Sequence, residues 1–165
     1  MFISILNVVT PSISILYQPN DSICFGDTVA VAVGTITNGG SNPILSWLVN
    51  GVNIGFPSNI LITDTLENGE SIQLEMNSNN LCQTSNLSVS QILVFSVGQE
   101  QTYYIDQDGD GLGSSGQSLV TCFQPAGYVD VPGDCDDNDP LVGICVDADG
   151  DGFTDDVDCN DTMEG

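Results

Sequence analysis

The sequence predicts an all-β protein. Its first hundred residues contain four segments in which apolar and polar side chains alternate with a period of two, as they do in half-buried strands: residues 28–36, 44–51, 71–77 and 87–97. Turn residues separate these segments, and Asn50-Gly51 is the pair that favours a two-residue hairpin turn. No stretch of eleven or more residues has a helical period.

Three residues refine the expected fold of residues 11–98. Cys24 precedes an early predicted strand, Trp47 lies within another, and Cys82 precedes the last ones. This order is typical of immunoglobulin-like β-sandwiches, in which a buried tryptophan packs against a disulfide that joins the two sheets. We therefore expect an Ig-like β-sandwich with a Cys24–Cys82 bond. The alternative is an ordinary core tryptophan with two unrelated cysteines.

The first ten residues allow two interpretations. The stretch FISILNVVTPSISI, residues 2–15, resembles QILVFSVGQEQTYY, residues 91–104, near the end of the predicted sandwich. Residues 1–10 are therefore either the last strand of a preceding module with its linker, or an ordinary first strand. The apolar start of the chain is too short to span a membrane.

Charge divides the chain into two regions. The 165 residues include 23 acidic side chains and no lysine, arginine or histidine, for a net charge of −23. Residues 1–99 carry six of these acids and residues 100–165 carry seventeen. This change in composition predicts a boundary near residues 98–101 and a separate acidic region over residues 99–165.

The missing basic residues exclude several classes of function. Nucleic acids are bound by neutralising phosphates with lysine and arginine, and anionic membranes attract the same side chains. Most acid–base and nucleophilic catalysis uses histidine or lysine. We therefore expect no nucleic-acid partner, no membrane insertion and no enzymatic activity.

The acidic region contains the same spaced pattern twice. Aspartates alternate with other residues at 106, 108 and 110, and again at 147, 149 and 151, and a glycine follows each third aspartate. This spacing lets a tightly curved loop direct three carboxylates at one point, and the next residue, Leu112 or Phe153, then offers a backbone carbonyl. Several oxygen donors without nitrogen or sulfur favour calcium over transition metals.

The two loops are completed differently. In the second, Asp155 and Asp158 occupy the ninth and twelfth positions, where acidic ligands are expected. The first has Ser114 and Gln117 there, so its missing acid is expected from the DCDDNDP stretch, residues 134–140. The alternative is a solvated acidic tail. We predict two or more calcium ions and these ligands: Asp106, Asp108, Asp110, Leu112, Asp134, Asp136, Asn138, Asp139, Asp147, Asp149, Asp151, Phe153, Asp155, Asp158 and Asp161.

The six cysteines indicate disulfides and an oxidising compartment. There is no C-x-x-C pair and no histidine, so zinc is a poor interpretation. Fifteen pairings are possible in principle. We expect Cys122–Cys135 and Cys145–Cys159, each closing a short loop around one metal site, in addition to Cys24–Cys82. Such bonds suit a segment too small to build a large core.

Two stretches resemble known bacterial surface proteins. Residues 11–98, with their W-x-V-N-G strand and NGE turn, are similar to the Ig-like or PKD-like repeats of very large Bacteroidota surface proteins. Residues 103–140 match a YY-x-D-x-DGDG…GYV…DCDD-x-D-P module and resemble thrombospondin type 3 calcium repeats. The resemblance implies calcium ligation by the aspartates above. A copper assignment that is sometimes attached to the module does not transfer, because this chain has no histidine.

The resemblance implies a non-enzymatic, calcium-binding structural or adhesive repeat of a long extracellular protein or fibre at the cell surface. Gliding-motility adhesins exported by type IX secretion are the parent that it suggests. Its partners would be neighbouring copies or modules, and a surface or glycan target. Alternatives are a filament subunit that uses strand complementation and a carbohydrate- or protein-binding accessory module. The Asp-(Ser/Thr)-aliphatic pattern of Bacteroidota O-glycosylation, with methionine in the aliphatic place once, predicts four acceptors: Ser22, Thr28, Thr65 and Thr162.

Overall fold

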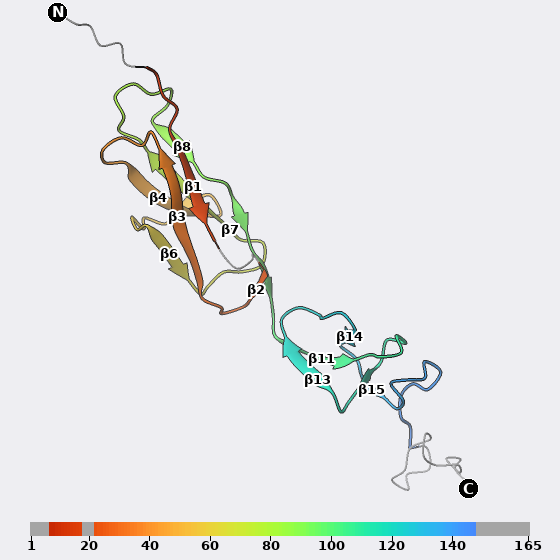
Figure 1. Cartoon of the computed structure of the whole chain (residues 1–165). Coiled ribbons are helices and arrows are strands. Elements are labelled where there is room, and N and C mark those ends of the chain that lie inside the picture. The colour runs from red at the N-terminus through yellow and green to blue at the C-terminus, as the bar shows by residue number, and fades with distance from the viewer. Residues whose placement is uncertain (1–6, 18–21, 148–165) are drawn as a thin grey trace, which may run out of the picture. The chain divides into compact units, whose positions relative to one another are not determined.

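The computed structural model describes residues 7–17 and 22–147, and within them it contains β-strands and turns but no helix (Figure 1). The all-β prediction is confirmed. No helix that could span a membrane occurs in this part of the chain. The chain divides into two compact units, Met1–Gly98 and Gln99–Gly165, which are described separately below.

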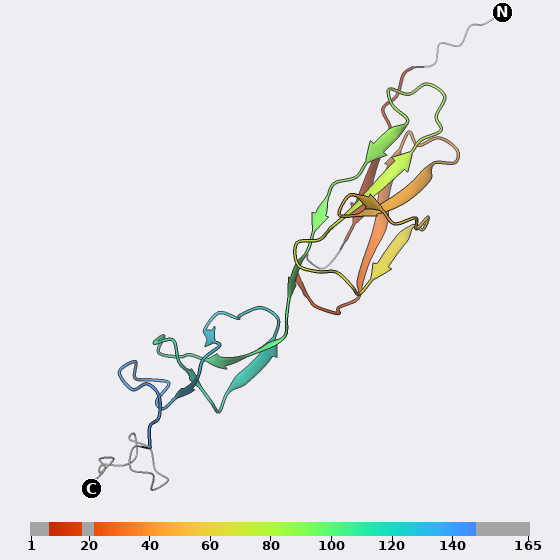
Figure 2. The same cartoon turned by 180° about the vertical axis from the view of Figure 1, so that it is seen from behind.

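The first unit contains two main sheets, which are seen from opposite sides in Figures 1 and 2. One is antiparallel, in the order β1-β3-β6: β1 (Ser12–Leu16), β3 (Val29–Thr37) and β6 (Ile60–Thr63). The other has the order β5-β4-β7-β8, with β9 also paired to β7: β4 (Ile44–Val49), β5 (Val52–Asn53), β7 (Ser71–Asn77), β8 (Leu87–Val89) and β9 (Leu93–Val94). Beside them, β2 (Ser22–Cys24) pairs in parallel with β10 (Ser96–Gly98).

The buried side chains of both sheets form one hydrophobic core. In β7 the alternation of the sequence places Ile72, Leu74 and Met76 on the buried face, and each is fully buried. Trp47 of β4 is also fully buried, and its indole N–H donates to the carbonyl of Ser58 at 2.8 Å. The first sheet adds residues from all three of its strands: Ile13, Ile15, Val29, Val31 and Leu61. Assignment to the Ig-like family stays a prediction.

The hairpin between β4 and β5 has the expected turn. Asn50 and Gly51 both have positive φ, 51° and 74°, as a type I′ turn requires. The Asn50 side chain also receives the N–H of Ser71 at 2.9 Å, so the turn is fixed to the start of β7.

The second unit has short strands and little apolar core. Three strands pair in the order β13-β11-β14: β11 (Gln101–Ile105), β13 (Ser118–Thr121) and β14 (Tyr128–Val129). A parallel pair follows, β12 (Gly113–Ser114) with β15 (Pro132–Asp134). Among the described residues of this unit, Tyr103 and Cys122 are its buried hydrophobic side chains.

The expected Cys24–Cys82 bond is wrong, since Cys82 is a free thiol. Cys24 pairs with Gly98 in β10, and the chain leading into β10 is bonded to Glu70, just before β7 begins. Cys82 follows the other end of β7, where its carbonyl accepts the N–H of Val9. Seven strand residues, about 23 Å at ~3.3 Å each, separate these two ends, whereas a disulfide needs its Cα atoms within about 7 Å.

The pairings Cys122–Cys135 and Cys145–Cys159 are also wrong, because Cys135 is bonded to Cys145 with a Cα–Cα distance of 5.2 Å. A short antiparallel bridge between Asp134 and Ile144 brings these two cysteines together. Cys24 and Cys122 are disulfide-bonded as well. Cys159 lies outside the described residues. Disulfides indicate that the chain reaches an oxidising, non-cytoplasmic compartment.

Candidate metal centre

The first acidic loop follows β11 directly and is shaped by its own aspartates. Asp106 accepts the N–H of Gly109 at 2.7 Å, Asp108 accepts that of Asp110 at 3.1 Å, and Asp110 accepts that of Leu112 at 2.7 Å. Gly111, at the sixth position, has a φ of 98°, which a side chain would disfavour. The sequence therefore folds here into a tight turn with its carboxylates on one side.

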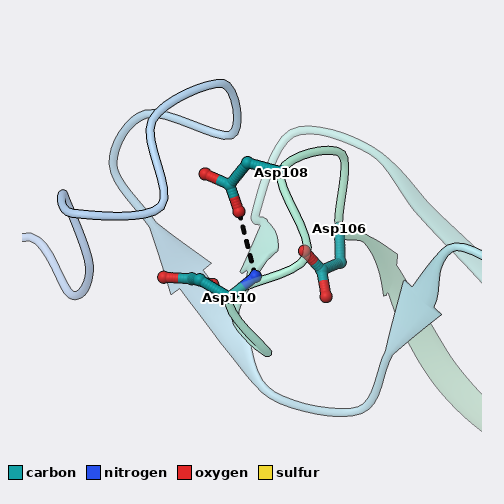
Figure 3. Close-up of side chains that lie close together, drawn as sticks. All are labelled: Asp106, Asp108 and Asp110. Carbon is teal, nitrogen blue, oxygen red and sulfur yellow. Dashed lines mark hydrogen bonds between the residues drawn. The ribbon is translucent and has the colours of Figure 1, made fainter.

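The three carboxylates form a cluster that could hold a metal ion (Figure 3). One oxygen from each of Asp106, Asp108 and Asp110 lies within 4.8 Å of the other two. Like charges at this separation repel one another, and the chain has no lysine, arginine or histidine to neutralise them.

Strand pairing places a fourth carboxylate, that of Asp134, near enough for the charges of Asp108 and Asp110 to act on it. The loop runs into β12, and β12 pairs with β15, which ends at Asp134. The N–H of Gly113 donates to the carbonyl of Val131 at 2.9 Å and fixes this pairing. A Cβ on Gly113 would lie 2.5 Å from the Cβ of Tyr104, so the close approach requires glycine. Asp134 is only 8% exposed.

The electrostatics of the cluster would favour a bound cation. One oxygen of Asp108 and one of Asp134 are buried without a hydrogen-bond partner among the described residues. Burial, followed by the negative charges of Asp108, Asp110 and Asp137, raises the pKa of the Asp134 carboxyl. The pKa of Asp108 is raised by burial and then by the charges of Asp110, Asp106 and Asp137. A cation bound near these carboxylates would oppose both shifts.

The segment after Asp134 returns to the first loop through Gln107. The backbone N–H of Gln107 donates to the carboxylate of Asp137 at 2.7 Å, and its side-chain amide donates to the side-chain oxygen of Asn138. The charge of Asp137, which is half-buried, acts on both Asp108 and Asp134. Asp137 is thus linked to the cluster by its charge and through Gln107. The sequence analysis named Asp134, Asp136, Asn138 and Asp139 in this segment and passed over Asp137.

The other predicted ligands in this segment lie differently. Asp136, Asn138 and Asp139 are exposed. Asp136 accepts the N–H of Asn138, and Asp139 accepts the N–H of Leu141, so each shapes its own turn. The carbonyl role of Leu112 stays a prediction.

Asp147, the first aspartate of the second loop, is exposed. The remaining predicted ligands of that loop lie outside the described residues: Asp149, Asp151, Phe153, Asp155, Asp158 and Asp161. Three of the expected glycosylation acceptors, Ser22, Thr28 and Thr65, are exposed, and the fourth, Thr162, lies outside the described residues.

No protein-family model and no curated protein sequence matches this chain. The chemistry of the site therefore rests on its own donors. They are carboxylate oxygens, which suit hard cations such as calcium and magnesium and are poor ligands for soft metals. The donor set therefore fits a hard cation.

Proposed function

We propose that Asp106, Asp108, Asp110 and Asp134 bind a calcium ion, with Asp137 beside them, and that this ion holds the second unit in its folded form. The observation that carries the proposal is the buried oxygen of Asp134, which has no hydrogen-bond partner and lies next to other carboxylates. A buried charge without a partner is costly, and a cation removes that cost.

Calcium fits better than magnesium because the donors come from two separate segments of chain. Calcium accepts six to eight oxygens in flexible geometry, whereas magnesium needs near-octahedral geometry and retains its water. Extracellular calcium modules typically bind at about 10⁻⁴–10⁻³ M. Binding to the folded state alone stabilises it by roughly 2.7 kcal/mol at a hundredfold excess over Kd.

The role that follows is structural and not enzymatic. A disulfide and an ion cluster brace a unit that has little apolar core, and a net charge of −23 keeps the chain soluble and self-repelling. We propose an extracellular module of a longer bacterial surface protein, stiffened by environmental calcium. Its adhesive role and its Bacteroidota parentage rest on the resemblance of its sequence motifs.

The first experiment is calorimetric titration of the chelator-treated chain with calcium, beside the variants Asp134→Asn and Asp130→Asn. Asp130 is an exposed acid of the same unit whose carboxylate accepts the Gln101 amide, so it matches the change in charge outside the cluster. We expect Asp134→Asn to weaken one site by about 10- to 100-fold and Asp130→Asn to leave it unchanged. Equal titration curves for all three proteins would overturn the proposal.

The second experiment is limited chymotrypsin digestion with and without a calcium chelator. Trypsin is useless here because the chain has no lysine or arginine. We expect chelation to expose residues 100–165 to cleavage and to leave residues 11–98 protected, since the ion supports only the second unit. A cleavage pattern that calcium does not change would contradict the role in folding.

A further inference from the structure

The strand β6 is an open edge of the first unit. Its neighbour β3 pairs with it along one side, and no second strand is bonded to it within the described part of the chain. The N–H of Val33 donates to the carbonyl of Asn59, so Asn59, Leu61 and Thr63 direct their backbone groups toward β3. The backbone groups of Ile62 therefore point outward, where another strand could pair with them.

The opposite edge of the same sheet is closed. The side-chain amide of Gln91 accepts the N–H of Ile15 at 3.3 Å and donates to the carbonyl of Ile15 at 2.6 Å. It thus occupies both backbone groups of Ile15, which an added strand would use. The contrast indicates that strand addition on this sheet is possible at β6 and obstructed at Ile15 of β1.

An apolar groove of about 420 Å³ runs beside the open edge. It is lined mainly by side chains from both sheets and the connections between them: Val49, Ile54, Phe56, Leu61 and Leu66. Glu70 is the one charged residue in its lining. Exposed apolar side chains continue the surface: Val52 at 67%, Ile62 at 63% and Ile60 at 46%. An occupant would have to be apolar and uncharged.

Charge restricts which partner can approach this surface. A second copy of the chain brings its own net charge of −23, so contact is favourable only where neither side carries acids. Residues 28–63, which include β6, contain no charged side chain, and neither do residues 1–20. The stretch FISILNVV, residues 2–9, is rich in residues that favour β-strands.

We propose that β6 and its groove accept an extended strand from a second copy of this chain, namely its uncharged N-terminal stretch. Main-chain hydrogen bonds to Ile62 would give affinity, and alternate side chains in the groove would give specificity. The copies would then be joined head to tail, an interface that extends without closing unless the rotation forms a ring.

The test measures self-association of the full chain by sedimentation velocity, in calcium and in about 1 M salt, which shortens the Debye length to ~3 Å. Ile62→Asp places a charge at the open edge, and Leu16→Asp makes the same change on β1, where Leu16 is 62% exposed. We expect the wild type and Leu16→Asp to associate as concentration rises, and Ile62→Asp to associate at least about tenfold more weakly because its charge would be buried without a partner.

A third variant and a peptide identify the occupant. Ile3→Asp/Leu6→Asp puts a charge on each face of the N-terminal stretch, and we expect it to abolish association. A peptide of residues 2–9 should bind this variant in trans and should not bind Ile62→Asp. Circular dichroism checks that Ile62→Asp is folded. A monomeric wild type that binds no peptide overturns the proposal. So does association that survives the Ile3→Asp/Leu6→Asp change or is lost equally in Leu16→Asp.

Discussion

The two units of this chain are stabilised in opposite ways. The first has a core of twelve buried hydrophobic residues, nine of them in its two main sheets, whereas two buried hydrophobic residues are described in the second. In the second unit the buried positions near the acidic loop are taken by a carboxylate, that of Asp134, and a disulfide lies beside it. Where apolar area is scarce, cross-links and ions supply the stability that a core would give.

Because of this difference, the stability of each unit should respond to different conditions. We expect the free energy of unfolding of the first unit to depend mainly on apolar burial. Under the proposed function, that of the second unit depends on calcium concentration and on the Cys135–Cys145 bond, because its acids repel one another without a cation. A substitution can therefore change the free energy of unfolding of one unit and leave that of the other unchanged.

The largest effect is expected for Trp47→Ala. The side chain is fully buried and its indole N–H is bonded to Ser58, so truncation leaves a cavity and an unpaired carbonyl. We expect the first unit to lose about 3–5 kcal/mol, measured by urea unfolding. Calcium affinity, measured by calorimetry, should stay the same.

The control is Val52→Ala, at a side chain that is 67% exposed. It should change the free energy of unfolding by less than about 0.5 kcal/mol. Weaker calcium binding in Trp47→Ala would show that the two units are energetically coupled and would break the comparison.

The next largest effect is expected for the double variant Cys135→Ser/Cys145→Ser. This disulfide spans ten positions and includes the segment that carries Asp137. Its removal should destabilise the second unit by about 2–4 kcal/mol and weaken calcium binding, while urea unfolding of the first unit is unchanged. Cys82→Ser is the matched control, since Cys82 is a free thiol. If Cys82→Ser lowers the free energy of unfolding of the second unit as much, the assignment of stability to the Cys135–Cys145 bond fails.

The sequence predicted those parts of the fold that local pattern determines. The alternation in residues 71–77 correctly places Ile72, Leu74 and Met76 in the core, and Asn50-Gly51 forms the expected turn. The segment 87–97 is divided into β8, β9 and β10. Between β8 and β9 the N–H of Leu74 donates to the Ser90 hydroxyl and not to a backbone carbonyl, and β10 pairs with β2 and not with β7. Periodicity alone does not reveal such an interruption.

The disulfide pairing could not be predicted from the sequence, because it depends on which strands become neighbours. Cys135 meets Cys145 through a bridge formed by Asp134 and Ile144, and nothing in their spacing distinguishes this pair from Cys122 with Cys135. The metal cluster was easier to predict. Spacing identifies Asp106, Asp108 and Asp110, and the missing acid pointed to the segment of Asp134. Asp137 was missed because its position is set by a hydrogen bond from Gln107, 30 residues away.

The smallest effect is expected for Asp137→Asn, and it tests whether Asp137 or its neighbour Asp136 contributes to calcium binding. Asp137→Asn keeps an acceptor oxygen for the N–H of Gln107 but removes a charge that acts on Asp108 and Asp134. We expect calcium affinity to fall by about tenfold, which is ~1.4 kcal/mol, and the calcium-free second unit to become slightly more stable because repulsion within the cluster is reduced. Asp136→Asn, at an exposed side chain that caps its own turn, should leave both quantities nearly unchanged. Calorimetric titration and thermal unfolding in chelator measure the two effects. A larger loss of affinity in Asp136→Asn would return the ligand role to Asp136, which the sequence analysis had named as a ligand.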